Sequence, residues 1–400
     1  MIWKNMKLPG ISVCVFVLAA ASSVAFADEI SDAKALLKNG QYEQAFSTLK
    51  KGTEKNNPRA EFGLGILYMK GQGVPKDDAQ AADWFRKAAE KGFAPAQYNL
   101  GFLYAGGRGV PKDDAMAVEW YRKAAGQGYD RAQYNLGLMY ELGLGVAKDY
   151  SQAVDWYRKA AAKGHALAAG TLGSLYSAGR GVPKDEVQAT RWYRKAAERG
   201  GAADQYRLAN RYADGLGIAK DVRSAAGWYR KAAELGYAPA QINLGAMYAS
   251  GQGVEKSNAK AIEWFRKAAD KGEPSAQFNL GVMYSEGRGV ERNYTEAADW
   301  FQKAAEKGHV SAQYNIGDLY RTGTGVPKDE GIAAGWYRKA AERGHVGAQV
   351  NLGVLYLNGR GVEKDYVQAA EWLRKAFARG NGRAGSLLKS MKDKGMIDRI

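Results

Sequence analysis

The sequence has almost none of the residues that crosslink a fold or bind a metal. Of 400 residues, one is cysteine (Cys14) and three are histidine. A single cysteine cannot form a disulfide within the chain, so packing must hold the fold together. His165, His309 and His345 each follow a glycine at the same place in a repeated pattern. We therefore predict that they are turn residues and that the protein has no metal site, catalytic histidine or cofactor.

Long apolar runs are equally scarce. The run from Ile11 to Ala21 is too short to span a bilayer, which takes about 20 residues. Lys4 and Lys7 precede it, and Ala25-Phe26-Ala27 follows with the small-x-small pattern that signal peptidase recognises. We predict a signal peptide over 1–27, cleavage after Ala27 and a periplasmic or secreted protein without a transmembrane segment.

What the sequence does contain is a repeat of 36 residues. The tryptophans reveal it, because they recur at this interval without insertion or deletion: Trp84, Trp120, Trp156, Trp192, Trp228, Trp264, Trp300, Trp336 and Trp372. A fixed period of this length is typical of stacked helical repeats. One helix pair cannot bury both of its faces, so the units must stack into an array.

The first half of each unit predicts an amphipathic helix. Ala96, Leu100, Leu103 and Tyr104 follow helical spacing and form one apolar face. Gly101 interrupts that helix, and its equivalents are glycine in most units although glycine costs about 1 kcal/mol relative to alanine there. We therefore expect a second helix to cross too closely for a Cβ atom. A Gly-x-Gly pair then ends the helix.

The second half predicts another helix, with a buried face of Ala81, Trp84, Phe85 and Ala88. Its first residue is preceded in every unit by a side chain that can cap free backbone N–H groups: Asp77, Asp113, Asp149, Asp185, Asp221, Ser257, Asn293, Asp329 and Asp365.

The opposite face of this second helix is charged. Asp83, Arg86, Lys87 and Glu90 predict an exposed ridge, with ion pairs such as Asp83 to Lys87 four residues apart. The basic residues contribute to a formal net charge of +16. This ridge either keeps the surface soluble or attracts an acidic envelope polymer or anionic lipid head groups. Nucleic acid is not expected as a partner, because the protein is exported.

The repeated pattern Ala-x-x-x-Leu-Gly-x-x-Tyr, Gly-x-Gly-Val and Ala-x-x-Trp-Phe/Tyr-x-x-Ala-Ala resembles the Sel1-like repeat, a relative of the tetratricopeptide repeat. The resemblance implies an all-α, right-handed α-solenoid whose first helices line a concave groove that binds a protein or peptide. We predict an N-terminal helical cap over 28–57, nine repeats over 58–380, and a capping half-repeat over 381–400. We expect the protein to act as a monomeric scaffold.

Two other functions are possible interpretations of this sequence. Some secreted relatives with paired cysteines are described as binding or hydrolysing penicillin, but this chain lacks those cysteines. Ser257 and Lys260 form a Ser-x-x-Lys pattern without its usual companions, and Ser257 falls in the capping slot. We therefore expect no enzyme, with a β-lactamase-like or cell-wall-acting enzyme as the alternative. A secreted factor that binds a host protein is a further alternative.

The fourth and fifth first helices depart from the pattern and form the candidate partner-binding site. In the fifth, Arg211 replaces the usual Leu or Met, and charged residues follow one stripe. In the fourth, small residues replace larger ones. Paired guanidinium groups could bind a carboxylate of a partner. The candidate residues are Gly170, Ser174, Ser177, Asp204, Arg207, Asn210, Arg211 and Asp214.

Overall fold

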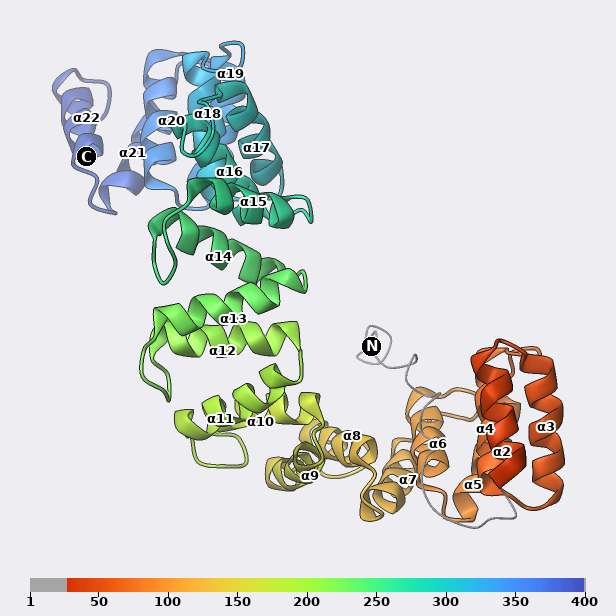
Figure 1. Cartoon of the computed structure of the whole chain (residues 1–400). Helices are drawn as coiled ribbons and strands as arrows, with labels where there is room; N and C mark the ends of the chain where they lie inside the picture. Colours follow the sequence, from red (N-terminus) through yellow and green to blue (C-terminus); the bar gives the residue numbers. More distant parts are fainter. Residues whose placement is uncertain (1–26, 399–400) are drawn as a thin grey trace. The chain divides into compact units, whose positions relative to one another are not determined.

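The computed structural model describes residues 27–398, whose regular structure is entirely helical (Figure 1). The predicted signal peptide lies outside the described residues except for Ala27. Nine helix pairs make up repeats 1 to 9, and no helix among the described residues could cross a bilayer. The first helices are α4 (Pro58–Lys70), α6 (Ala94–Gly106), α8 (Asp130–Leu142), α10 (Ala166–Ala178), α12 (Ala202–Asp214), α14 (Ala238–Ser250), α16 (Pro274–Glu286), α18 (Val310–Thr322) and α20 (Val346–Asn358). The second helices are α5 (Asp78–Glu90), α7 (Asp114–Gly126), α9 (Tyr150–Ala162), α11 (Glu186–Glu198), α13 (Val222–Glu234), α15 (Asn258–Ala269), α17 (Tyr294–Glu306), α19 (Glu330–Glu342) and α21 (Tyr366–Phe377).

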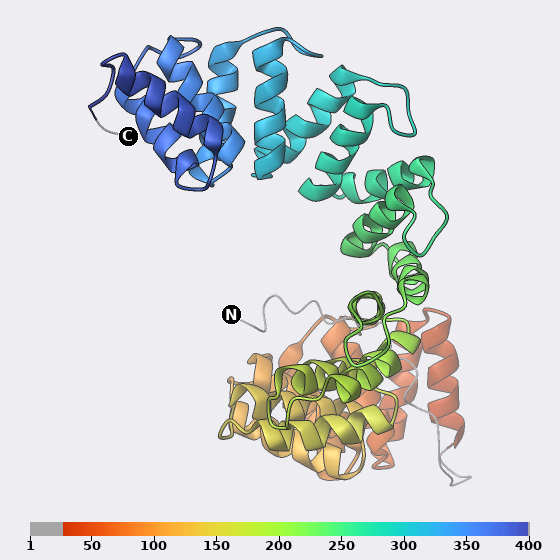
Figure 2. The same cartoon turned by 90° about the vertical axis from the view of Figure 1, so that its left-hand side faces the viewer.

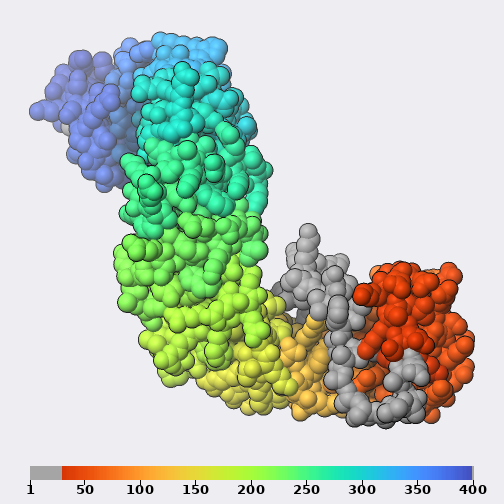
Figure 3. Space-filling model, in the orientation of Figure 1, coloured from red at the N-terminus to blue at the C-terminus, as the bar shows by residue number. Residues whose placement is uncertain are grey.

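Additional helices precede and follow the repeats: α2 (Ala27–Lys38), α3 (Tyr42–Glu54) and α22 (Gly382–Asp393). The chain divides into two compact units. Unit 1 comprises Met1–Asp204 and Leu216–Ile218, and unit 2 comprises Gln205–Gly215 and Ala219–Ile400. Within each unit, consecutive helices pack on one another, from α2 to α11 and from α13 to α22, which is the arrangement of an α-solenoid (Figures 1 and 2). Side chains fill the spaces between the ribbons (Figure 3).

The predicted caps of the second helices are confirmed. Each capping residue has extended backbone geometry, and its side chain accepts a hydrogen bond from a backbone N–H in the first turn. Asp149 Oδ1, for example, accepts from the backbone N–H of Gln152 at 3.0 Å. Ser257 Oγ likewise accepts from the backbone N–H of Lys260 at 3.3 Å. The Ser-x-x-Lys pattern is therefore explained by a helix cap.

The expected close approach at the mid-helix glycine is also confirmed. A Cβ atom added to Gly101 would lie 3.0 Å from the ring of Tyr121, on the second helix of the same repeat. At Gly281 the corresponding distance to Phe301 is 2.6 Å. An aromatic ring thus occupies the space that a side chain on the first helix would need.

The ion pairs that we predicted on the charged ridge are wrong. Instead of pairing with Asp83, Lys87 lies over the indole of Trp84, 4.1 Å from the ring centroid, while Asp83 pairs with Arg86. The same stacking occurs in all nine repeats, with distances of 3.9 to 4.3 Å. Each such contact contributes about 0.5–1 kcal/mol at an exposed site. The tryptophan is only half-buried in most repeats, so the lysine completes its cover.

The arginine beside that lysine links neighbouring repeats. Arg158 donates to the hydroxyl of Tyr176 at 2.6 Å, and Tyr176 belongs to the first helix of the next repeat. The same bond is made by Arg122, Arg230, Arg266 and Arg338. Much of the positive charge therefore stabilises the stack, which the sequence pattern did not reveal.

Candidate functional site

The exposed side chains of the first helices, together with the tyrosine rings that reach them from the second helices, form what we call the first-helix surface of each unit. In unit 2 its most elaborate part is a polar cluster in repeats 8 and 9. Tyr337 donates to Asp318 Oδ1 at 2.6 Å, and Arg321 donates to the same oxygen at 2.9 Å and to the Tyr337 hydroxyl at 3.1 Å. Asn351 of α20 reaches Asp318 at 3.5 Å. The cluster therefore joins two repeats.

This cluster is linked by several hydrogen bonds and is still partly accessible. The Arg321 and Asp318 side chains are 41% and 28% exposed, so a partner could reach both. Burial, followed by the hydrogen bond to Asp318, raises the pKa of Tyr337 well above its usual value. The phenol thus remains a hydrogen-bond donor at any physiological pH. A carboxylate and a guanidinium held side by side can together bind the N–H and C=O groups of a peptide.

A histidine closes the cluster at one end. His345 stacks on Tyr314 with ring centroids 4.4 Å apart, and its Nδ1 accepts a hydrogen bond from the backbone N–H of Ala348 at 3.1 Å. His165 and His309 make the equivalent contacts. The histidines are therefore helix N-caps with a defined tautomer, which is more specific than the turn residues that we predicted. Among residues 27–398, no cluster of His, Cys, Asp and Glu could hold a metal ion.

Sequence reasoning missed the role of the tyrosine that follows each tryptophan. The Tyr193 hydroxyl lies 3.0 Å from Ser174 Oγ in unit 1, and the Tyr229 hydroxyl donates to Asn210 Oδ1 at 2.6 Å in unit 2. Burial raises the pKa of Tyr229 to about 12, so it too remains a donor. The signal was present in the sequence. This slot is tyrosine wherever the first-helix residue 19 positions earlier is polar (Ser174, Asn210 and Asp318), and it is phenylalanine or leucine only where that residue is apolar. Tyr121 and Tyr157 face the apolar Phe102 and Leu138, so the correlation holds in one direction only.

Four of the eight predicted site residues lie in unit 1. Ser174 is exposed, and Ser177 donates to Glu186 at 3.0 Å. Gly170 is buried, and a Cβ atom added to it would lie 2.7 Å from Asp204 Oδ1. Asp204 is itself only 6% exposed. Its carboxylate therefore occupies the space that the missing side chain at Gly170 leaves.

The other four lie in unit 2. Arg207 and Asp214 are exposed, and Asn210 is half-buried. Arg211 is 6% exposed, because it occupies the slot that holds a buried leucine or methionine in most other repeats. The charged stripe therefore includes two interior residues, Asp204 and Arg211, and two surface residues. Whether any of the eight binds a partner stays a prediction.

Comparison with known proteins identifies the repeat. The family model described as the Sel1 repeat matches nine segments: 58–93, 94–129, 130–165, 167–201, 202–237, 238–273, 274–309, 310–345 and 346–381. The chain belongs to the Sel1 repeat family. Proteins of this family generally act by binding other proteins.

Solved structures agree with this assignment. A protective antigen of uropathogenic Escherichia coli strains, c5321, is 36% identical over 93% of this chain and 91% of its own, with a TM-score of 0.62. A Sel1 repeat protein from Oxalobacter formigenes is 40% identical over 60% of this chain and 97% of its own, with a TM-score of 0.53. Among proteins with a curated description, none matches this chain.

Proposed function

We propose that this Sel1 repeat protein is an extracytoplasmic scaffold that binds a protein or peptide partner on its first-helix surface. The observation that carries the proposal is that each repeat contains two kinds of slot, which vary to different extents. Slots that pack the helices keep their residue types from repeat to repeat, whereas the exposed first-helix slots vary. Where those slots are polar, tyrosine hydroxyls hold them in place, and preorganised groups lose less entropy on binding.

Site-specific photo-crosslinking tests this surface. A photoreactive phenylalanine derivative replaces Val282 of α16 or Val354 of α20, two half-buried residues in the slot that Asp318 occupies in α18. The matched control replaces Val367, which is 65% exposed on α21. We expect a crosslinked partner from periplasmic and culture-supernatant fractions at both first-helix positions and none at Val367. Equal crosslinking at all three positions would contradict the proposal.

A triple variant of the polar cluster tests the first-helix surface more specifically. Asp318→Val, Arg321→Leu and Tyr337→Leu together give repeat 8 the residues that repeat 9 has in the same slots. The packing has a precedent within the chain, so the helical melt should barely change. We expect the crosslinked product to fall at least tenfold, about 1.4 kcal/mol of binding free energy.

The fourth and fifth repeats remain part of the proposal. The surface residues Arg207 and Asp214 are the side chains of unit 2 that a partner would contact, and Ser174 is a separate candidate contact in unit 1. Arg211 would act from the interior by positioning its neighbours. The double variant Arg207→Ala with Arg211→Leu restores the usual apolar slot. We expect this variant to bind a verified partner about tenfold more weakly, with an unchanged helical melt.

An export signal over residues 1–27 would place this surface outside the cytoplasm. The description of the Escherichia coli relative as a protective antigen supports that location. The enzyme alternative is tested with a chromogenic cephalosporin. We expect no hydrolysis by the pure protein, and hydrolysis that the Ser257→Ala variant loses would support the enzyme instead. A second class of partner, an acidic envelope polymer, is favoured by a specific feature of the repeat junctions.

A further inference from the structure

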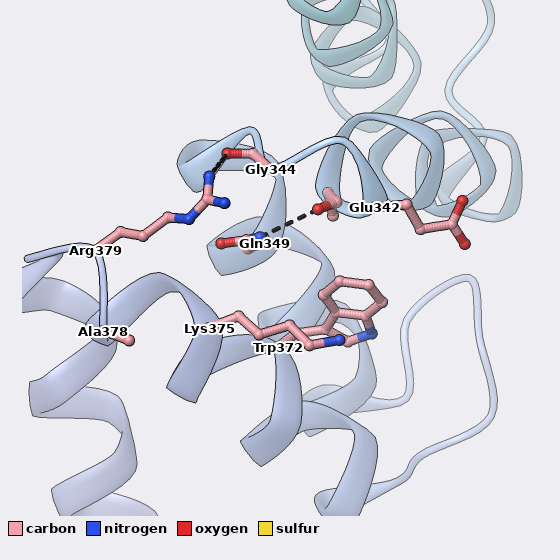
Figure 4. A pocket seen from close by; sticks show the side chains of 8 residues that line it. Glu342, Gly344, Gln349, Trp372, Lys375, Ala378 and Arg379 are labelled. Atoms are coloured by element: carbon pink, nitrogen blue, oxygen red, sulfur yellow. Dashed lines mark hydrogen bonds between the residues drawn. The ribbon is translucent and has the colours of Figure 1, made fainter.

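A hollow of about 480 Å³ lies at the junction of repeats 8 and 9 in unit 2 (Figure 4). We call it the Gln349 hollow. The amide of Gln349 projects into it from α20, with the indole of Trp372 and the guanidinium of Arg379 on either side. Lys375 and Glu342 complete its charged rim. The hollow is built from side chains that recur in the other repeats.

Gln349 carries an unsatisfied acceptor inside this hollow. Its Nε2 donates to the carbonyl of Ala341 at 3.1 Å, which fixes the orientation of the amide. Its Oε1 has no hydrogen-bond partner among the described residues, although the residue is only 3% exposed. A buried acceptor without a partner costs about 1–3 kcal/mol, so a donor that enters the hollow gains that stabilisation.

The same feature recurs along unit 2. Gln241, Gln277 and Gln313 are buried, donate to a backbone carbonyl of the preceding repeat, and have an unpartnered Oε1. Each occupies the slot of Gln349, so four successive junctions present the same oxygen. Each junction also has a basic residue bonded to a glycine carbonyl of the preceding repeat, namely Lys271, Lys307, Arg343 and Arg379.

Unit 1 shows the same hollow with another side chain in that slot. A cavity of about 450 Å³ contains Glu61, Trp84, Lys87 and Lys91 in the slots of Gln349, Trp372, Lys375 and Arg379. Glu61 Oε1 accepts from Lys91 at 2.6 Å, and Glu61 Oε2 has no partner among the described residues. A buried acceptor oxygen without a partner therefore lies beside the hollow whether the residue is glutamate or glutamine.

Repeat 2 shows which group satisfies this oxygen. There the basic slot holds Gln127, whose Nε2 donates to Gln97 Oε1 at 2.8 Å. An amide N–H from the solvent side is thus a suitable partner for the acceptor. At the four junctions of unit 2, where the slot is lysine or arginine, the cation bonds to the glycine carbonyl instead, and the buried amide oxygen keeps no partner among the described residues.

The chemistry of the hollow selects a ligand with three kinds of group. The buried oxygen requires an N–H or O–H donor, the two cations at the rim favour a carboxylate, and Glu342 can accept from a hydroxyl. We propose that the Gln349 hollow and its equivalents bind successive sugars of an acidic glycan. An acetamido N–H donates to Gln349 Oε1, and a neighbouring sugar carboxylate pairs with Lys375 and Arg379. This site rests on the acidic-polymer candidate and is separate from the first-helix surface.

Binding to a defined oligosaccharide tests the proposal on the full chain. The probe alternates glucuronate with N-acetylglucosamine, and polyglutamate of equal charge and neutral dextran are the comparison ligands. The test variant places glutamine in the basic slot of all four junctions, as in repeat 2, through Lys271→Gln, Lys307→Gln, Arg343→Gln and Arg379→Gln. The control removes the same number of charges from exposed turns, through Lys256→Gln, Arg292→Gln, Lys328→Gln and Lys364→Gln.

We expect calorimetry to show that the oligosaccharide binds more tightly than polyglutamate or dextran. The test variant should bind it at least tenfold more weakly, and the control variant within about threefold of the original affinity. Equal losses in the two variants would show that net charge alone is responsible and would overturn the proposal. So would an absence of binding, or polyglutamate binding as tightly as the oligosaccharide. The Asp318, Arg321 and Tyr337 variant should bind the oligosaccharide normally, so failure here is distinguishable from failure of the first-helix surface.

Discussion

Replacing Gly281 with alanine tests how closely the two helices of a repeat approach each other. The added methyl group would lie 2.6 Å from ring carbons of Phe301. Carbon atoms prefer separations of about 3.5–4.0 Å. Phe301 is 2% exposed, so the ring has no solvent to move into. We expect an overpacking cost of about 1–3 kcal/mol.

Two opposing effects determine the net change in the free energy of unfolding. Alanine is better than glycine inside a helix by about 1 kcal/mol, which offsets part of the steric cost. Repeat 5 carries Ala209 in the equivalent slot beside Tyr229, so the helices can separate by a small amount. We therefore expect the Gly281→Ala variant to be less stable than the original protein by up to about 2 kcal/mol.

Gly335→Ala is the matched control. Gly335 lies within α19, and no atom lies within 4 Å of a Cβ atom added there. The helix-propensity gain of about 1 kcal/mol is therefore not opposed. The difference between the two variants isolates the steric cost.

Urea unfolding, followed by circular dichroism, compares the two variants. Hydrogen exchange in α16 and α17 accompanies it, because long repeat arrays need not unfold in one step. Faster exchange in those helices is expected for Gly281→Ala and slower exchange in α19 for Gly335→Ala. If Gly281→Ala stabilises the protein as much as Gly335→Ala does, the close approach of the helices is wrong.

Three further predictions concern acid stability, processing and stacking. Burial lowers the pKa of His165, His309 and His345 below 6.5, so the neutral caps contribute fully above that pH and the stability is lost as the pH falls below it. Asn381 caps α22 in the same slot. The melting temperature of the triple His→Asn variant should therefore depend less on pH between about 7.5 and about 5 than that of the original protein. An identical pH dependence of the two proteins would refute the role of the caps. N-terminal sequencing of the exported protein should begin at Asp28, and retention of Met1 would disprove the signal peptide. Deletion of residues 240–275 should leave a helical, soluble protein, since each repeat contacts only its neighbours, and aggregation of that variant would contradict the linear array.

Much of the fold follows from the sequence because its signals are local. Helix caps such as Asp149, the glycines that end helices and the spacing of Ala96, Leu100 and Leu103 each act within a few residues. Repetition strengthens each signal, since every slot occurs nine times in the sequence. A period of 36 residues then leaves stacking as the way to bury both faces of a helix pair.

Only the tertiary structure decided the contacts between slots. Lys87 lies over Trp84 instead of pairing with Asp83. A cation–π contact with a half-buried indole stabilises the lysine more than an exposed ion pair does. Arg158 reaches Tyr176 in the next repeat, and Arg211 and Asp204 lie in the interior. These outcomes depend on the angle and spacing at which consecutive helix pairs stack. That geometry brings together residues 18 or 35 positions apart that belong to different repeats, and the periodicity within a single helix does not predict such contacts.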